Sequence, residues 1–455
     1  MRLAPQLSST RLAIFWNTGS QLVGKFINSG TTFLITILIA RSFGVDGFGD
    51  FTKITTYIAF FYLLADFGIN AVYLQKQETE ENLWGVLLGL RLVGSIALVF
   101  LSLAILSFLP RGIGQGYTSL VRLGIILFSP AIIVQAVITT ANASFQKHLR
   151  YDLSTLSLTI GSIISLLCVW VITMVVSPSV GSVFATSGFL IGLVVTSVTS
   201  LFFAAKLTAL TLSLRWKSML PLLLSSIPLG LTLLFNQLYF RADTFILTIT
   251  RSTTEVGLYG LAYKFFELPL AIATFFMNSM YPLLLAQQTQ SAKLPSGRLG
   301  TGKTQNFQNL IWKSGIFLLL ASLILLLLFW FIAPLITLIR PEFTPSVGAF
   351  RILILGLPFF FLSSLTMWTL VTLKKHVLLA SIYGASMVGT IILDLYAIPR
   401  FGYMGAAWIT VISEAIVLCV SAGYLWRLFY SMNIDKHQVQ NSKSQTNSNV
   451  QNLKS

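Results

Sequence analysis

The sequence has few charged residues and few of the side chains that enzymes use for catalysis. Only 10% of its 455 residues are charged and only three are histidine, whereas about a quarter of a typical soluble domain is charged. It holds no glycine-rich phosphate-binding loop, no histidine or cysteine spacing typical of a metal site, and no nucleophile elbow. The sequence therefore predicts neither an enzyme, nor a bound cofactor or metal, nor a transporter with its own ATPase.

Disulfide bonds and soluble domains are also not expected. The two cysteines, Cys168 and Cys419, both fall inside apolar stretches, so they do not form a disulfide framework. No gap between the apolar stretches is long enough for a soluble domain.

Apolar residues are what the sequence has in abundance. They make up 55% of the chain, and the mean hydropathy is +0.81. A membrane-spanning helix needs about 20 largely apolar residues, and about twelve such stretches follow one another along the chain. We therefore predict an all-α polytopic membrane protein with spans near residues 15–40, 54–75, 83–108, 118–143, 153–176, 182–205, 219–249, 258–284, 311–338, 349–373, 377–398 and 404–428.

Two segments of the chain resemble each other. Ala40–Lys53 and Thr250–Lys264 each follow an apolar stretch, and in each an aromatic–glycine pair precedes a lysine at the same spacing. The offset is about 210 residues, and many transporters consist of two related halves with the substrate path between them. We predict two six-helix bundles, 1–210 and 211–430, around a central cavity, followed by a disordered polar tail, 431–455. Chance similarity between two membrane loops is the alternative.

The distribution of basic residues predicts the orientation. With both termini in the cytoplasm, the basic residues of the inside segments outnumber those of the outside loops by about three to one, as the positive-inside rule requires. The net charge of +16 is then largely a consequence of topology. No aromatic–basic module accompanies it, so nucleic acid is not an expected partner.

Charged residues inside the predicted spans are the candidate functional residues. Each charge in hydrocarbon costs about 2.5–3.5 kcal/mol on insertion scales, so such side chains normally face a water-filled cavity or one another. Four basic residues lie away from the helix ends, and a cavity lined by them would attract an anion: Lys25, Arg91, Arg241 and Lys264. Snorkelling to the nearer interface is the alternative for each.

The acidic residues inside the spans are candidates for ion coupling or gating. Burial favours the protonated form of a carboxylate, which can then load and release a proton. Five acids are in this position: Asp66, Asp243, Glu267, Asp394 and Glu414. Structural pairing is an equally good interpretation for the charges on either side of the loop Arg251–Glu255, because Arg241 and Asp243 can pair with each other or with Lys264 and Glu267.

A segment near the C-terminus carries a family resemblance. Thr390–Ile416 resembles the pattern of polysaccharide flippases in the multidrug/oligosaccharidyl-lipid/polysaccharide (MOP) superfamily, through Ile398-Pro399, Gly402, Gly405-Ala406-Ala407 and Ser413-Glu414. ARSFGVDGFGDFTKI and DFGI in the first half, and RADTFIL, VGLYGLAYK and YPLL in the second, resemble other recurring segments of that family. We expect Pro399 to end the eleventh span and Gly402 to allow a tight reversal. Asp394 departs from the pattern, where many relatives would have asparagine.

The resemblance implies a Wzx-type flippase. Such a protein moves an oligosaccharide on a polyprenyl pyrophosphate from the cytoplasmic to the outer leaflet of a bacterial or archaeal plasma membrane, by alternating access and with ion coupling. The four basic residues named above would contact the anionic head, and the five acids would serve coupling or gating. Membrane lipid is a further partner, and a glycan polymerase and glycosyltransferases of the same pathway are the protein partners that it suggests.

Four other functions remain as alternatives. A multidrug extruder of the same superfamily would favour an acidic, aromatic cavity, and a lipid II flippase generally has helices beyond twelve. A glycan polymerase would need a sizeable outside catalytic loop, which this sequence lacks. A scaffold for a glycan assembly complex would not need buried charges in both halves.

Overall fold

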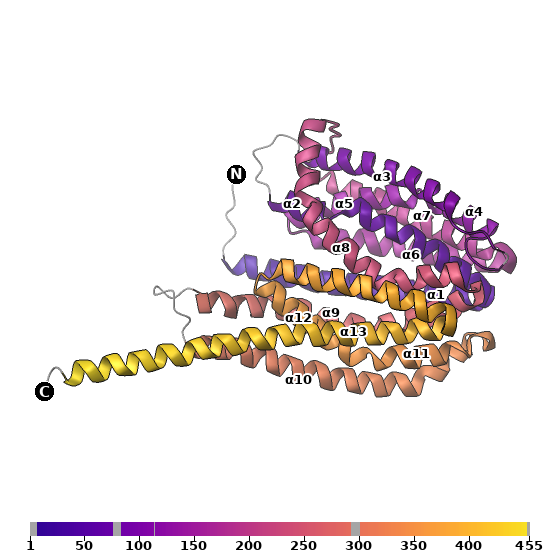
Figure 1. Cartoon of the computed structure of the whole chain (residues 1–455). Coiled ribbons are helices and arrows are strands. Elements are labelled where there is room, and N and C mark those ends of the chain that lie inside the picture. The colour runs from indigo at the N-terminus through magenta and orange to yellow at the C-terminus, as the bar shows by residue number, and fades with distance from the viewer. Residues whose placement is uncertain (1–6, 76–82, 113, 293–300, 453–455) are drawn as a thin grey trace. The chain divides into compact units, whose positions relative to one another are not determined.

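The computed structural model describes residues 7–75, 83–112, 114–292 and 301–452, and this part of the chain is almost entirely helical (Figure 1). Its only strand-like pairing is a pair of isolated bridges, Arg111 with Gly116 and Gln115 with Ser252. The predicted all-α class is confirmed. The helices are α1 (Leu7–Asp66), α2 (Ile69–Gln75), α3 (Leu83–Phe108), α4 (Ser119–Phe128), α5 (Ala131–Lys147), α6 (Tyr151–Val175), α7 (Pro178–Ala204), α8 (Trp216–Thr250), α9 (Thr253–Ala292), α10 (Thr301–Ile332), η1 (Ala333–Leu338), η2 (Pro341–Phe343), α11 (Ser346–Leu355), α12 (Leu357–Thr372) and α13 (His376–Asn452).

The described helices account for every predicted span. Eight stretches of the described residues are long and apolar enough to cross a membrane. Two pairs of helical segments, one formed by the two parts of α8 and one by α11 and α12, are bent at a short break, and counting each pair as one span raises the number to ten. Two of the eight, Val23–Asp66 and His376–Tyr430, are 44 and 55 residues long. Each covers two predicted spans, and counting each as two gives the twelve that hydropathy predicts.

Both long helices turn at a Phe–Gly pair. Gly44 in α1 has φ +71°, and Gly402 in α13 has φ +61°. Residues with a side chain avoid this region of backbone space, so glycine is required at both turns. The reversal at Gly402 is as predicted.

The expected helix end at Pro399 is wrong, because α13 continues through this proline as far as Gly402. A proline inside a membrane helix is tolerated where other groups satisfy nearby carbonyls. Here Arg400 Nη1 donates to the carbonyl of Tyr396 at 3.0 Å, and Arg251 Nε donates to that of Ile398 at 3.0 Å.

Contacts divide the chain into two compact units. Unit 1 comprises Met1–Leu268, Ile332–Leu353 and Met387–Ile409, and unit 2 comprises Pro269–Phe331, Ile354–Ser386 and Thr410–Ser455. The two bundles 1–210 and 211–430 stay a prediction. The backbone of α13 is helical as far as Asn452, but the side chains from residue 431 on lie outside the described residues. The disordered tail 431–455 therefore stays a prediction as well.

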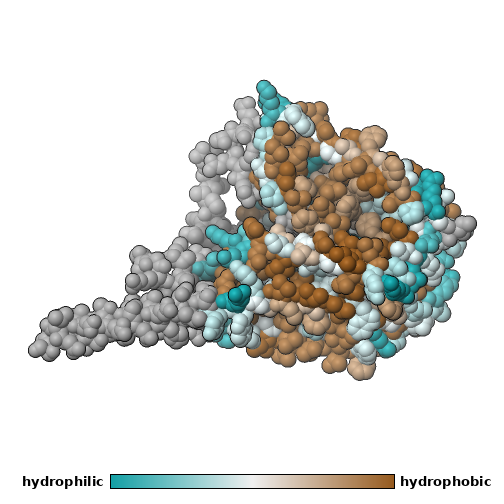
Figure 2. All heavy atoms as spheres, viewed as in Figure 1, coloured by the Kyte–Doolittle hydropathy of each residue, from teal (hydrophilic) through white to brown (hydrophobic). Residues whose placement is uncertain are grey.

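Large apolar side chains cover much of the surface. Phe100 of α3 is 70% exposed, Val175 of α6 is 79% exposed and Phe331 of α10 is 78% exposed. Figure 2 shows hydrophobic residues spread over most of the visible face, with hydrophilic ones gathered near helix ends. Such exposure is unfavourable in water and favourable in lipid, so these helices span a membrane.

Candidate functional site

Two basic residues and one acid form a cluster on neighbouring membrane helices. Glu267 on α9 accepts from Arg241 of α8 at 2.6 Å and from Lys264 of α9 at 2.8 Å. Lys264 and Glu267 are three residues apart, which places them on one face of the helix. The Arg241 guanidinium also lies 5.1 Å from the centre of the Tyr263 ring. We call Arg241, Lys264 and Glu267 the charge triad.

The charge triad itself has one more positive than negative charge, but the carboxylate of Asp243 lies close enough to interact with the charge of Arg241, so the four charges together are neutral. The predicted pairing across the loop between α8 and α9 is confirmed for Arg241 and Glu267. Yet the side chains stay 28% exposed for Arg241, 34% for Lys264 and 32% for Glu267. Two cations that share the carboxylate of Glu267 and are still partly exposed, between two helices of a membrane protein, can exchange it for an anionic ligand.

The predicted candidate Arg91 lies in a different environment. Its side chain in α3 is fully buried, and Nη2 donates to Asp66 of α1 at 2.5 Å. Nη1 lies 3.4 Å from the hydroxyl of Thr140 in α5. This pair is neutral and its cation cannot reach a ligand, which favours a structural role for both residues over substrate binding or coupling.

Two acids of unit 1, Asp243 and Asp394, are brought near each other. Asp243 of α8 accepts hydrogen bonds from the Tyr259 hydroxyl and from the backbone N–H of Thr244. Asp394 of α13 is fully buried, and it lies close enough to Asp243 for the two carboxylates to interact electrostatically. Neither oxygen of the Asp394 carboxylate has a hydrogen-bond partner among the described residues. A buried carboxylate in the state of Asp394 requires a proton or a bound cation.

Glu414, the fifth candidate acid, belongs to unit 2. It is 2% exposed and accepts a hydrogen bond from the Ser363 hydroxyl of α12. Further along the two helices, the hydroxyls of Thr366 and Ser421 lie 2.8 Å apart. These polar contacts join α12 to α13 inside unit 2.

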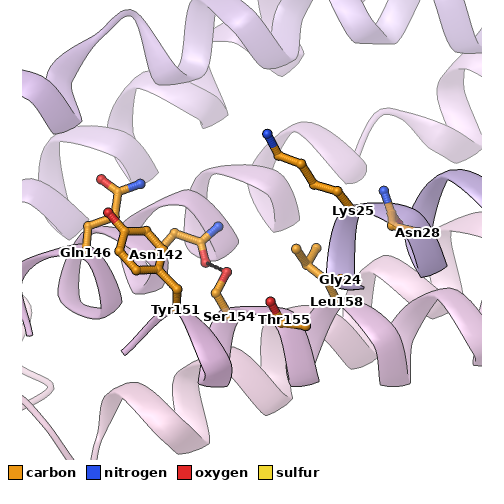
Figure 3. A pocket seen from close by; sticks show the side chains of 9 residues that line it. All are labelled: Gly24, Lys25, Asn28, Asn142, Gln146, Tyr151, Ser154, Thr155 and Leu158. Carbon is orange, nitrogen blue, oxygen red and sulfur yellow. Dashed lines mark hydrogen bonds between the residues drawn. The ribbon is translucent and has the colours of Figure 1, made fainter. Parts of the chain in front are cut away.

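Lys25 lies at a polar pocket between α1, α5 and α6 (Figure 3). The cavity volume is about 210 Å³, and its lining consists of Gly24, Lys25, Asn28, Asn142, Gln146, Tyr151, Ser154, Thr155 and Leu158. Figure 3 shows Asn142, Gln146 and Tyr151 on one side of the pocket and Lys25 and Asn28 of α1 on the other. We call it the α1–α5–α6 pocket.

The two segments that resemble each other in sequence pack against each other. Lys53 of α1 is 1% exposed, and its ammonium donates to the hydroxyl of Thr253 at 2.6 Å and to the carbonyl of Gly116 at 2.9 Å. The neighbouring Thr254 donates from its hydroxyl to Asp46 of α1 at 2.6 Å. We call this contact, between residues 45–53 of α1 and 253–260 of α9, the repeat seam.

Glycines allow the close approach of the two backbones in the repeat seam. A Cβ on Gly49 would collide with the carbonyl of Thr253, and a Cβ on Gly257 would collide with the carbonyl of Val45. Each segment therefore places a glycine against the backbone of the other. The two glycines are not equivalent in the repeat, because the counterpart of Gly49 is Gly260, which meets the side chain of Thr52.

The connections predicted to lie outside gather around the repeat seam. Gly114 and Gly116, between α3 and α4, accept from Thr253 and Lys53. The turns at the two Phe–Gly pairs contact neighbouring connections as well. At the first turn, Arg340 and Glu342 lie against Gly44, and the Phe43 ring lies against Gly181. At the second turn, Glu255 accepts from the backbone N–H of Tyr403. The positive-inside pattern groups the same connections on one side of the membrane.

Several residues of these sites were absent from the sequence-based candidates. Lys53 was assigned only to a loop, although the repeated aromatic–glycine–lysine spacing was a signal for it. The sequence gave no signal for three uncharged residues of the pocket, Asn142, Gln146 and Tyr151. Uncharged polar residues are common in membrane helices, so they do not stand out as charged residues do.

Comparisons with known proteins agree with one another. The family model described as "Polysaccharide biosynthesis protein" matches residues 14–288. The lipid II flippase MurJ, in an inward closed conformation, is similar in structure with TM-score 0.70 and 17% identity, over 90% of this chain and 87% of that one. An inward-facing MATE-family multidrug transporter of the MOP superfamily gives TM-score 0.70 and 12% identity, over 89% and 95%. No curated protein matches the sequence.

Proposed function

Because the chain belongs to the polysaccharide biosynthesis protein family and is similar in fold to a transporter of the MOP superfamily, we propose that it moves a polyprenyl-pyrophosphate-linked oligosaccharide from the cytoplasmic to the outer leaflet. A bacterial or archaeal plasma membrane, with both chain termini in the cytoplasm, is the setting that supports this function. The role is transport, so no catalytic residue is assigned.

The charge triad is the observation that carries this proposal. Pyrophosphate is a compact, multiply charged anion, and arginine and lysine bind phosphate oxygens through charge-assisted hydrogen bonds. Arg241 and Lys264 share a single carboxylate and remain about one-third exposed. An arriving pyrophosphate can therefore replace Glu267 as the partner of one cation.

Translocation across reconstituted vesicles tests the function. The wild type is expected to move a polyprenyl-pyrophosphate-linked oligosaccharide, and Lys264→Ala should lower its apparent affinity about tenfold or more, because a hydrogen bond to a charged group contributes ~1.5–3 kcal/mol. Glu267→Gln should raise the affinity, since it releases both cations from their shared carboxylate. Lys217→Ala, at an exposed lysine near the start of α8, is the matched control and should leave transport unchanged.

Two results would contradict the proposal. One is a wild type that exports organic cations and moves no lipid-linked glycan under an imposed proton or sodium gradient, which would favour a multidrug extruder. The other is an equal loss of transport in Arg241→Ala and Glu267→Gln, which both remove the ion pair between α8 and α9, and this would mean that the charge triad only holds the two helices together.

We propose in addition that Asp394, beside Asp243, couples transport to an ion gradient. Asp66 and Glu267 are each paired with a cation, and Glu414 and Asp243 each accept hydrogen bonds from neutral donors. Asp394 is the candidate acid whose two oxygens lack a hydrogen-bond partner among the described residues. A proton or sodium ion that enters from one side and leaves on the other would alternately neutralise Asp394 and leave it charged.

The repeat seam supports alternating access. It joins residues from both predicted halves at the connections predicted to lie outside, which would close a path on that side while substrate enters from the cytoplasm. Opening toward the outer leaflet would require Lys53 to leave the hydroxyl of Thr253 and the carbonyl of Gly116.

A further inference from the structure

Beside the charge triad, the molecule has a second polar site, the α1–α5–α6 pocket. Gly24 of α1 meets Thr155 of α6 at its floor, where a Cβ on the glycine would collide with the threonine side chain. The Ser154 hydroxyl of α6 donates to the side-chain oxygen of Asn142 in α5 at 2.8 Å, which fixes the orientation of this amide. The pocket is thus built by three helices that pack closely, and part of its lining is held in place.

The lining residues define the chemistry of a ligand. The lining contains three carboxamides (Asn28, Asn142, Gln146), three hydroxyls (Tyr151, Ser154, Thr155) and one ammonium group, and no carboxylate of the described residues lines the cavity. Amides and hydroxyls both donate and accept hydrogen bonds, as sugar hydroxyls do. An acyl chain would leave these polar groups without partners, and a cationic ligand would find no counter-charge.

The position and size of the pocket narrow the ligand further. It opens beside the connection between α5 and α6, with Gln146 just before Lys147 and Tyr151 just after Arg150. The basic residues of this connection place it on the predicted cytoplasmic side. Pockets for drug-sized ligands have volumes of about 300–1,000 Å³, so a cavity of about 210 Å³ holds only part of an oligosaccharide.

We propose that the α1–α5–α6 pocket binds a sugar residue of the lipid-linked glycan on the cytoplasmic side, with Asn28, Gln146 and Tyr151 as its recognition residues. This inference rests on the proposed function. Two sites then recognise two parts of one substrate. The charge triad binds the pyrophosphate that all such lipids share, and the pocket distinguishes a lipid that carries a glycan from one that has lost it.

Binding to the full-length protein in nanodiscs tests the proposal. The probes are a short-chain polyprenyl pyrophosphate without sugar and the same lipid carrying one glucose, galactose or N-acetylglucosamine. At least one sugar-bearing probe should bind the wild type about tenfold more tightly than the bare lipid. Asn28→Ala and Gln146→Ala should each remove most of this difference and leave the affinity for the bare lipid unchanged.

Ser29→Ala is the matched control, because Ser29 is the exposed neighbour of Asn28 on α1 and does not line the cavity. This variant should keep the full preference for the sugar-bearing probe. Asn28 is itself exposed, so its alanine variant should fold even if Gln146→Ala does not. Tyr151→Phe keeps the ring and removes only the hydroxyl, which should weaken the sugar-bearing probe alone.

Four outcomes would overturn the proposal. If the wild type binds bare and sugar-bearing lipids equally, the pocket does not read the sugar, although the proposed function stands. If the pocket variants lower the affinity for both probes equally, the cavity does not distinguish a sugar-bearing lipid from a bare one. If they lower it only in nanodiscs that contain phosphatidylglycerol, the cavity binds a lipid headgroup. A wild type that binds none of the probes would refute the proposed function itself.

Discussion

At the scale of single residues, the pairing of buried charges decides which of them can work in transport. Arg91 and Asp66 were predicted for substrate binding and for coupling respectively, and the structure joins them to each other. Hydropathy identifies a charge inside a span but not the direction in which its helix is rotated. The sequence could therefore predict both residues as unusual without revealing that they are partners.

Removal of one member of the Arg91–Asp66 pair should destabilise the protein strongly. Asp66→Ala leaves a fully buried guanidinium without its carboxylate, which costs about 3–5 kcal/mol. The double variant Arg91→Met with Asp66→Leu should recover most of this loss, since apolar residues of similar volume often replace a buried ion pair at no cost. Thermal unfolding in detergent measures both, and a double variant as unstable as Asp66→Ala would contradict the structural role.

Replacement of Asp394 should uncouple transport from its ion gradient. Asp394→Asn removes the charge that requires a proton or cation, so we expect glycan-lipid movement to persist at a passive rate that no longer responds to an imposed gradient. Asp152→Asn, at an acid paired with Arg150 beside a connection, should keep the gradient response. Vesicle assays with proton and sodium gradients applied separately measure this, and an unchanged response in Asp394→Asn would exclude Asp394 from coupling.

At the scale of elements, the turns inside α1 and α13 show how far sequence patterns reach. Glycine at 402 was predicted to permit a reversal and does so, because its φ of +61° is closed to most other residues. The end of the helix was placed at Pro399, three residues too early. A proline reports a missing N–H donor, which by itself does not end a membrane helix, and the sequence does not reveal that Arg251 of another element binds the carbonyl of Ile398 in the last turn before Gly402.

The turn at Gly402 should not tolerate a side chain. Gly402→Ala forces alanine into a positive-φ conformation that is almost restricted to glycine, at about 1–3 kcal/mol, and drives its Cβ into the Glu255 carboxylate. Gly389→Ala, earlier in α13 where no atom lies within 4 Å of the position that a Cβ would take, should be neutral or stabilising by up to about 1 kcal/mol. Thermal unfolding of both variants checks this, and equal stabilities would show that the turn does not depend on glycine.

At the scale of the whole molecule, the twelve spans and the resemblance between two segments followed from the sequence. That these segments pack against each other did not. Sequence similarity marks Gly49 and Gly257 as residues of related segments, but contact between them depends on how the helices are arranged in space. The α1–α5–α6 pocket escaped prediction for a similar reason, because it combines uncharged residues from helices more than 100 residues apart in the chain.

A covalent link across the repeat seam should stop transport. Asp46 and Thr254 contact each other directly, so Asp46→Cys with Thr254→Cys can be joined by a short reducible thiol crosslinker after the free cysteines Cys168 and Cys419 are changed to serine. We expect transport to fall to background when the link forms and to return after reduction. Each single-cysteine variant should be unaffected by the reagent, and a linked protein that still transports would rule out the seam as a gate.

The hydrogen bond between Lys53 and Thr253 also constrains the order of synthesis. Lys53 waits for a partner that lies 200 residues later in the chain, which at roughly 5–20 residues per second takes on the order of 10–40 s. During that interval the ammonium can already donate to the carbonyl of Gly116, which lies 63 residues later in the chain, but its second partner is still missing. The hydrogen bonds of this buried lysine are therefore complete only when the second half of the chain has been made.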